Sequence, residues 1–189
     1  MDEIVKQALR KWPNVPACSG WLGLDQRGRW WLRDEAAQQA GDFLHSKGTV
    51  VEHDKLLAFI ARNYAVDAQG RWFFQNGPQR VFVELELAPM VWRVQADGAV
   101  HSHTEVAVRQ VQQVVVDEYG YVFLLCDGVL GVVHAQDVLA VSELIERGQW
   151  SVSEVVRDAL ELRFGFVRSP QAMELKGSAQ HGNHSEKSL

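Results

Sequence analysis

Histidine and acidic residues that could bind a metal ion gather in one short segment of the chain. His101, His103 and Glu105 follow one another at intervals of two residues, so on a β-strand their side chains share one face at steps of about 7 Å. A His-x-His strand can offer two imidazoles to one ion such as zinc. His134 lies in the same acidic part of the chain and is a further candidate ligand. The alternative is a loop or edge strand that faces water, because a metal site needs convergent ligands from other elements.

A second candidate site is an adjacent pair of tryptophans among arginines. Trp30 and Trp31 are flanked by Arg27, Arg29 and Arg33. Neighbouring residues of a strand point to opposite faces, so one core cannot take both indoles. The outward indole is covered either by a helix, which is the plainer interpretation, or by a partner. Exposed tryptophan beside arginine is typical of binding hot spots, so we expect these five residues to contact a partner. Stacking with cationic contact leaves single-stranded nucleic acid as a less favoured ligand.

Nucleophilic chemistry has weaker support. Cys18 and Cys126 form neither a Cys-x-x-Cys pair nor a disulfide framework. Both fit small buried apolar residues better than activated nucleophiles, which need a base and a lowered pKa. The sequence also lacks Gly-x-Ser-x-Gly, a P-loop, Gly-x-Gly-x-x-Gly and His-Glu-x-x-His. These observations favour a protein that is not an enzyme.

The elements that must position these residues are dominated by one turn motif. Leu22–Leu32, Tyr64–Phe74 and Val114–Leu124 each contain a short apolar run, then Asp-x-x-Gly, then a run rich in aromatic or β-branched residues. A shorter Asp-Gly version lies at Asp97. Aspartate bonds to its own backbone in turns, glycine accepts a positive φ, and aromatic and β-branched residues favour strands. The motif therefore predicts repeated β-hairpins.

The remaining patterns predict helices at the margins of a sheet. Apolar residues at helical spacing indicate about three helices, over residues 2–11, 53–63 and 138–147. Strict alternation predicts a half-buried strand over Arg80–Leu87. Further strands are expected over Met90–Val94, Val106–Val108, Val111–Val116, Gly128–Val133 and, last, Leu160–Val167. We expect an α+β fold with a mostly antiparallel sheet, either open and curved or closed into a partial barrel.

Length and composition set the domain organisation. With 189 residues and an apolar fraction of 47%, the chain can bury a core without disulfides or metal. We expect residues 1–168 to form a single globular domain. Residues 169–189 hold few apolar side chains, so we expect a disordered C-terminal tail that is dispensable for folding.

Charge and targeting patterns narrow the partners. The net charge is −5, which argues against nucleic acid, because phosphate binding usually needs an excess of lysine and arginine. The deficit lies in residues 101–150, where two basic residues face seven acidic ones. A solvated acidic face explains this segment more simply than a docking surface does. The start of the chain lacks a signal-peptide pattern and no apolar run approaches a membrane span, so a cytoplasmic location is expected.

Three segments resemble a known family. They are Lys11–Cys18, Gly20–Asp25 and, most specifically, Arg71–Val81, which reads Arg-Trp-Phe-Phe-Gln-Asn-Gly-Pro-Gln-Arg-Val. The chain resembles a proteobacterial family of unknown function over residues 11 to about 168. The resemblance implies a bacterial, cytoplasmic, single-domain protein and carries no activity, cofactor or catalytic residue.

These observations lead to two expectations from different classes. The first is a non-catalytic binding or regulatory domain without a cofactor, whose aromatic-rich surface binds a protein or a small effector. The alternative is a metal-binding protein or metal-assisted hydrolase that uses His101, His103 and Glu105 with one divalent ion.

Overall fold

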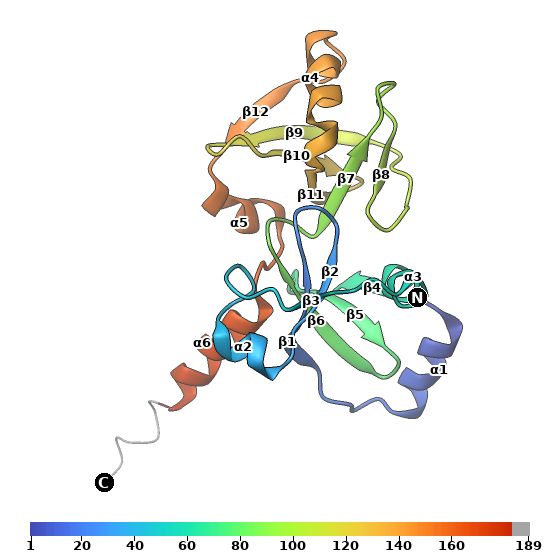
Figure 1. Ribbon diagram of the computed structural model, residues 1–189, viewed down its shortest axis with the longest axis vertical. Helices are drawn as coiled ribbons and strands as arrows, with labels where there is room; N and C mark the ends of the chain where they lie inside the picture. Colours follow the sequence, from blue (N-terminus) through green and yellow to red (C-terminus); the bar gives the residue numbers. More distant parts are fainter. Residues whose placement is uncertain (183–189) are drawn as a thin grey trace.

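The computed structural model describes residues 1–182, and residues 177–182 by their backbone alone. Its α+β architecture has two six-stranded sheets, neither of which closes into a barrel (Figure 1). Most strand pairs are antiparallel, while β1–β6, β7–β11 and β9–β12 are parallel. The predicted fold class is confirmed, but two mixed sheets replace the single sheet that we expected.

The first sheet, called sheet 1, has the order β3-β2-β1-β6-β5-β4. Its strands are β1 (Cys18–Leu24), β2 (Trp30–Leu32), β3 (Thr49–Val50), β4 (Tyr64–Val66), β5 (Trp72–Asn76) and β6 (Gln79–Leu85). Sheet 2 has the order β12-β9-β10-β11-β7-β8. Its strands are β7 (Met90–Val94), β8 (Val100–Ser102), β9 (Val111–Asp117), β10 (Val122–Cys126), β11 (Val129–Val133) and β12 (Val152–Val155).

Six α-helices and two 3-10 turns accompany the sheets in the described part of the chain. They are α1 (Glu3–Lys11), α2 (Glu35–Ala40), α3 (Asp54–Arg62), η1 (Ala135–Asp137), α4 (Val138–Glu146), η2 (Arg157–Ala159), α5 (Leu160–Phe164) and α6 (Pro170–Gly182). The three helices that the apolar spacing predicted correspond to α1, α3 and α4. The other three α-helices are short or terminal, and their sequences lack a clear apolar stripe.

The three Asp-x-x-Gly segments each connect two antiparallel strands. Gly28, Gly70 and Gly120 have φ angles of 80°, 77° and 81°, and each donates its N–H to the aspartate carbonyl three residues earlier. In each turn one aspartate oxygen also accepts the N–H groups two and four residues later. Local side-chain chemistry therefore sets the geometry of these hairpins.

The two sheets share a hydrophobic core. One apolar cluster contains Leu24 and Val83 of sheet 1 together with Val115 and Phe123 of sheet 2. The other face of sheet 2 forms a second cluster beneath α4, which contributes Val141 and Leu144. Figure 1 shows the same arrangement, with α4 on one side of sheet 2, α5 on its other side, and α1, α2, α3 and α6 around sheet 1.

The predicted strand over Leu160–Val167 is wrong at its start. Residues 160–164 form α5, which ends at Gly165 in the left-handed conformation with φ 67°. Leu160 is buried, and Phe164, one helical turn later, packs against the same cluster. A short apolar run does not distinguish a strand from a buried helical turn, so periodicity alone could not identify α5. The expected strand at residues 106–108 is a loop with a single bridge between Ala107 and His101.

The expectation of a disordered tail is corrected for residues 170–182, which form α6. Ser169 donates its hydroxyl to Oε2 of Glu84 at 2.6 Å, and the N–H of Gln171 donates to Oε1 of the same carboxylate at 3.0 Å. Glu84 and Phe82 lie on the face of β6 opposite the buried Val83, and both are 2% exposed, so β6 is buried on both faces rather than on one. Residues 183–189 lie outside the described residues.

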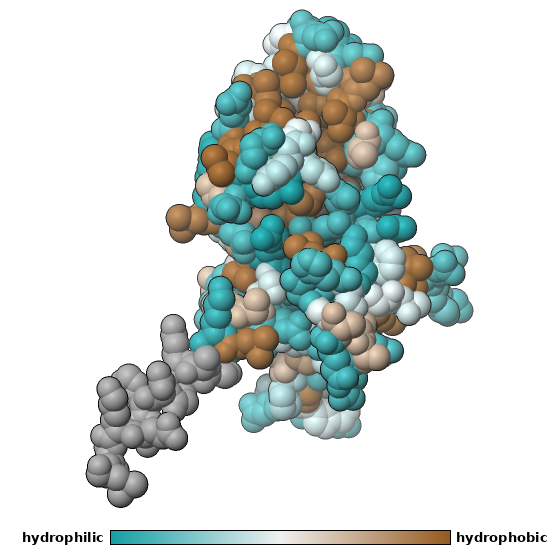
Figure 2. Space-filling model, turned by 60° about the vertical axis from the view of Figure 1, so that its left-hand side comes forward, coloured by the Kyte–Doolittle hydropathy of each residue, from teal (hydrophilic) through white to brown (hydrophobic). Residues whose placement is uncertain are grey.

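Apolar side chains also reach the surface. Figure 2 shows them gathered over the upper part of the molecule, where sheet 2 and α4 lie. Exposed apolar residues of these elements and their flanks include Leu139, Val152 and Val156. Within residues 1–182, no helix combines the length and the apolar character needed to cross a membrane.

Candidate functional site

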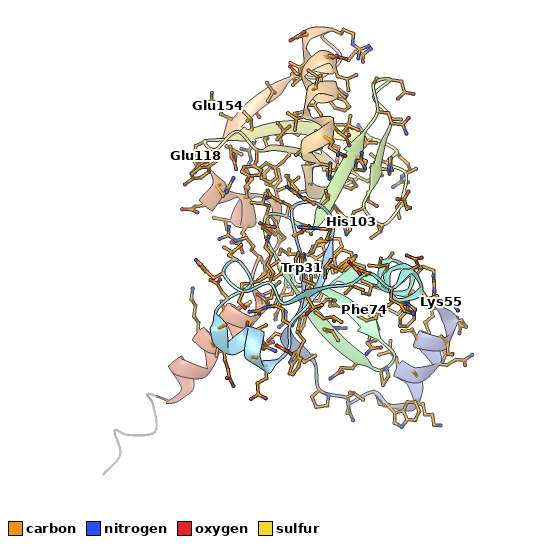
Figure 3. The ribbon with its side chains drawn as sticks, viewed as in Figure 1. Trp31, Lys55, Phe74, His103, Glu118 and Glu154 are labelled. Carbon is orange, nitrogen blue, oxygen red and sulfur yellow. The ribbon has the colours of Figure 1, made fainter. Side chains whose placement is uncertain are left out.

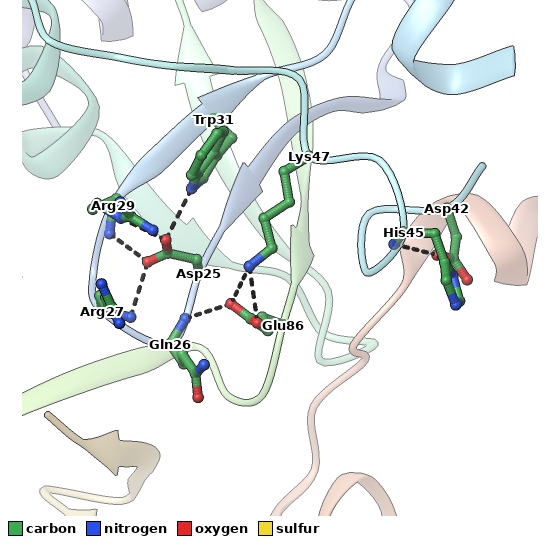
Figure 4. A network of polar contacts seen from close by, with 9 residues as sticks. All are labelled: Asp25, Gln26, Arg27, Arg29, Trp31, Asp42, His45, Lys47 and Glu86. Atoms are coloured by element: carbon green, nitrogen blue, oxygen red, sulfur yellow. Dashed lines mark hydrogen bonds and ion pairs between the residues drawn. The ribbon is translucent and has the colours of Figure 1, made fainter. Parts of the chain in front are cut away.

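The first hairpin turn fixes the tryptophan–arginine segment. Oδ1 of Asp25 accepts the N–H groups of Arg27 and Arg29, and Oδ2 accepts Nε of Arg29 at 2.7 Å and Nε1 of Trp31 at 3.0 Å (Figure 4). Burial alone would raise the pKa of Asp25, but these hydrogen bonds outweigh it and hold the pKa below its ordinary value. Arg29 and Trp31 therefore stabilise the turn that carries them.

Two of the five predicted partner-binding residues are in the interior. Trp30 is 3% exposed, and its ring meets that of Tyr64 edge to face at 5.1 Å between centroids. Arg33 is 1% exposed and donates to the carbonyl oxygens of Gly20 and Ser46, at 3.1 and 2.9 Å, among others. The expectation that all five residues form one contact face is therefore wrong, because only Arg27, Arg29 and part of Trp31 reach solvent.

The four predicted metal ligands do not gather. Nδ1 of His103 accepts the N–H of Val91 at 3.2 Å, and Nδ1 of His134 accepts the N–H of Gln136 at 3.3 Å. His101 pairs with Arg93 across β7 and β8, while Glu105 lies in the following loop. In the described part of the chain, no three histidine, cysteine or acidic side chains come close enough to hold a metal ion. A metal centre at these residues is therefore not supported by their geometry.

The structure instead brings Trp30, His103 and Glu105 to one pocket. Its volume is about 370 Å³, and it lies between α3, the β1–β2 turn and the loop after β8. The residues that line it are Gly28, Trp30, Leu57, Ala58, Ala61, Arg62, His103, Thr104 and Glu105. Figure 3 shows His103 on the side of sheet 2 that faces sheet 1. Both sheets therefore contribute to this pocket.

His103 is the unusual polar group of the pocket. Burial lowers its pKa to about 4 against a smaller opposing effect of Asp25, so the imidazole is neutral at pH 7. Because Val91 donates to Nδ1, the proton of the neutral ring resides on Nε2. Within residues 1–182, this buried Nε2 has no hydrogen-bond partner. Its ring lies 5.6 Å from Trp30 and 6.0 Å from Tyr64 between centroids.

The loop after β8 is held by its own hydrogen bonds. The hydroxyl of Ser102 accepts the N–H groups of Thr104 and Val106 and lies 2.7 Å from the hydroxyl of Thr104. The N–H of Glu105 donates to the carbonyl of Ser102 at 2.9 Å. The loop therefore has a defined shape, and it presents Glu105 at the mouth of the pocket.

The pocket offers mainly apolar contacts, and neither Cys18 nor Cys126 is among the residues that line it. Its floor is apolar or aromatic, and the hydroxyl of Thr104 already lies within hydrogen-bonding distance of Ser102. Burial raises the pKa of the Cys126 thiol to about 12, and burial with the nearby Glu174 raises that of Cys18. Neither thiol is therefore a nucleophile near neutral pH.

Sequence reasoning missed this pocket because its walls are far apart in the chain. Trp30 and His103 were assigned to two different sites, and no spacing rule connects them. Ala58 and Ala61 were not identified at all. The available signal was their small size, three residues apart on a helix whose other apolar residues are large.

Comparisons with known proteins give a family but no activity. The chain resembles the crystal structure of a DUF1285 family protein from Silicibacter pomeroyi DSS-3, with a TM-score of 0.48 and 11% identity over 76% of this chain and 85% of that one. A second is a DUF1285 family protein from Shewanella baltica OS155, with a TM-score of 0.45 and 16% identity over 66% of this chain and 91% of that one. No curated protein matches. A family model described as "Protein of unknown function (DUF2946)" matches residues 1–171, so the chain belongs to this family of unknown function.

Proposed function

We propose that the protein is a non-catalytic binding domain whose ligand is a small molecule held in the pocket between α3, the β1–β2 turn and the loop after β8. One observation carries the proposal: a pocket of about 370 Å³ with mostly apolar walls is lined in part by His103, whose buried Nε2 has no hydrogen-bond partner among the described residues. Small-molecule sites are typically concave, mostly apolar and equipped with a few polar groups. A titratable group with a strongly displaced pKa beside a cleft is a further mark of such sites.

The pocket lies between the two sheets, so a ligand bound there could regulate how they are arranged. Gly28 and Trp30 belong to the first hairpin of sheet 1, whereas His103 follows β8, an edge strand of sheet 2. A ligand that contacts both would favour the arrangement in which the two sheets hold these walls together. The protein would thus bind a small effector. The pocket takes the place of the surface of Trp30, Trp31 and the arginines as the proposed binding site.

The proposal includes a location in the bacterial cytoplasm. Both cysteines are free thiols, as expected in a reducing compartment.

The experiment uses 2-naphthalenemethanol, an uncharged planar probe smaller than the pocket. Added to ¹⁵N-labelled protein, it is expected to shift the amide signals of Gly28, Ala61 and Thr104 saturably. Ala61→Leu fills the pocket and is expected to abolish these shifts. Ala36→Leu adds the same atoms on the exposed face of α2 and serves as the matched control. Shifts that do not saturate, or that persist unchanged in Ala61→Leu, would contradict the proposal.

A further inference from the structure

Glu105 has a backbone conformation that side chains usually avoid. Its φ is 61°, and Asp127, with φ 48°, is the other residue besides glycine with a positive φ in the described part of the chain. Glycine adopts this conformation without steric cost, whereas a side chain adds strain. A glutamate at such a position therefore calls for a separate explanation.

For Asp127 the explanation is structural. Its Oδ2 accepts the N–H of Arg109 at 3.0 Å, and Nε of Arg109 lies 3.7 Å from the same oxygen. Within residues 1–182, the Glu105 carboxylate makes no comparable hydrogen bond or ion pair. Its charge raises the pKa of Arg93 slightly, but the guanidinium of Arg93 is already bound to Asp137 at 2.6 Å. The backbone turn at Glu105 uses no atom of its side chain.

The two charged residues that line the pocket, Arg62 and Glu105, differ in how they are paired. Arg62 also lines the pocket, but its Nε donates to both carboxylate oxygens of Asp2, at 3.1 and 3.2 Å. The charge of Arg62 is therefore offset by Asp2, whereas that of Glu105 is not offset by an ion pair within the described residues. A cationic group is thus favoured over an anionic one at this rim.

We propose that the ligand of this pocket is a small organic ammonium ion, with its charged group at the Glu105 carboxylate and its apolar body on Leu57, Ala61 and the edge of Trp30. This inference rests on the proposed function and adds the chemical class of the ligand. The ammonium donates hydrogen bonds to the carboxylate, which are stronger than those between neutral groups. The apolar body displaces water from the helix face and the indole.

Three probes of equal shape test the class of ligand: 2-naphthalenemethylamine, 2-naphthalenemethanol and 2-naphthoic acid. Their dissociation constants are measured at pH 7 by NMR titration of the full chain. The amine is expected to bind about tenfold more tightly than the acid, with the alcohol between them. Because the carboxylate is near the surface, added salt is expected to reduce this preference.

Variants of Glu105 separate ligand recognition from structure. Glu105→Gln is expected to remove the preference for the amine over the acid. Glu105→Gly is expected to remove it as well and to raise the thermal midpoint, because glycine relieves the positive φ. Glu154→Gln alters an exposed glutamate on β12 and is expected to retain the preference.

The outcomes distinguish this inference from the function on which it rests. If the alcohol binds in the pocket but the amine has no advantage over the acid, the ligand class is wrong and the proposed function stands. A preference for the amine that persists in Glu105→Gln also overturns the ligand class. If none of the three probes binds, the proposed function fails and this inference fails with it.

Discussion

The N–H of Gln171 donates to Oε1 of Glu84 at 3.0 Å and thereby joins two segments that are 87 residues apart. Burial raises the pKa of Glu84, although Ser169, Gln171 and the charge of Arg33 favour its ionised form. The start of α6 is therefore part of the environment that a buried carboxylate requires.

Ending the chain after Arg168 should consequently destabilise the protein. The truncation removes both donors to Glu84 together with the helix that covers it, and hydrogen bonds to a charged group contribute about 1.5 to 3 kcal/mol each, so we expect the unfolding free energy to fall by about 3 kcal/mol. Urea unfolding of the truncated and full-length chains measures the difference. An unchanged midpoint after truncation would show that the contacts of α6 are energetically silent.

Two glycines at equivalent turn positions give a matched test of backbone strain and close packing. A Cβ at Gly70 would lie 2.5 Å from the carbonyl oxygen of Gly165, whereas one at Gly120 would meet nothing within 4 Å. Gly120→Ala should cost about 1 kcal/mol, from its positive φ alone. Gly70→Ala should cost at least about 1 kcal/mol more, because the chain near Gly165 must move. Equal losses of unfolding free energy in the two variants would mean that the chain near Gly165 moves without measurable cost.

The turns were predictable from the sequence because aspartate and glycine act on their own backbone. The burial of β6 was not, because the residues that cover Glu84 come from α6, far along the chain. The pleat predicted that Trp30 and Trp31 face opposite ways, but it does not say which face meets the second sheet. The face of β2 that becomes buried depends on how Val91, Val115 and Phe123 of the second sheet pack against sheet 1. The alternation of residues along one strand carries no information about this packing.

The two tryptophans should therefore differ in what their removal costs. Trp30→Ala opens a cavity in the shared core and should lower the unfolding free energy by about 4 kcal/mol. Trp31 is partly exposed, and its main loss is the hydrogen bond to Asp25, so Trp31→Ala should cost about 1 to 2 kcal/mol. Denaturant unfolding of both variants checks the order. A larger loss for Trp31 would contradict the assignment of Trp30 to the core.

The arginines of the same segment give a parallel contrast. Arg33 donates to the carbonyl oxygens of Gly20, Ser46 and Gly41, so Arg33→Ala leaves several acceptors unsatisfied and should cost about 3 kcal/mol or more. Arg27 is exposed, and Arg27→Ala should change stability by less than about 0.5 kcal/mol. Thermal unfolding of both variants measures the contrast. Comparable losses would mean that the network around Arg33 contributes little.

Stability should also depend on pH through His103, whose folded-state pKa of about 4 lies below the ordinary value of 6.5. Between these two values the unfolded chain binds a proton that the folded chain does not, so the unfolding free energy falls as the pH is lowered from about 6.5 towards 4. At pH 4.5 this effect amounts to about 2 kcal/mol relative to pH 7.

His103→Phe keeps a ring between Trp30 and Tyr64 but cannot bind the proton. Although it leaves Val91 without an acceptor and is less stable at pH 7, it should lose about 2 kcal/mol less than the native chain when the pH falls from 7 to 4.5. Urea unfolding of both proteins at the two pH values gives this difference directly. Parallel losses in the two proteins would show that the folded structure does not lower the pKa of His103, and the lowered pKa assigned to this buried ring would then be wrong.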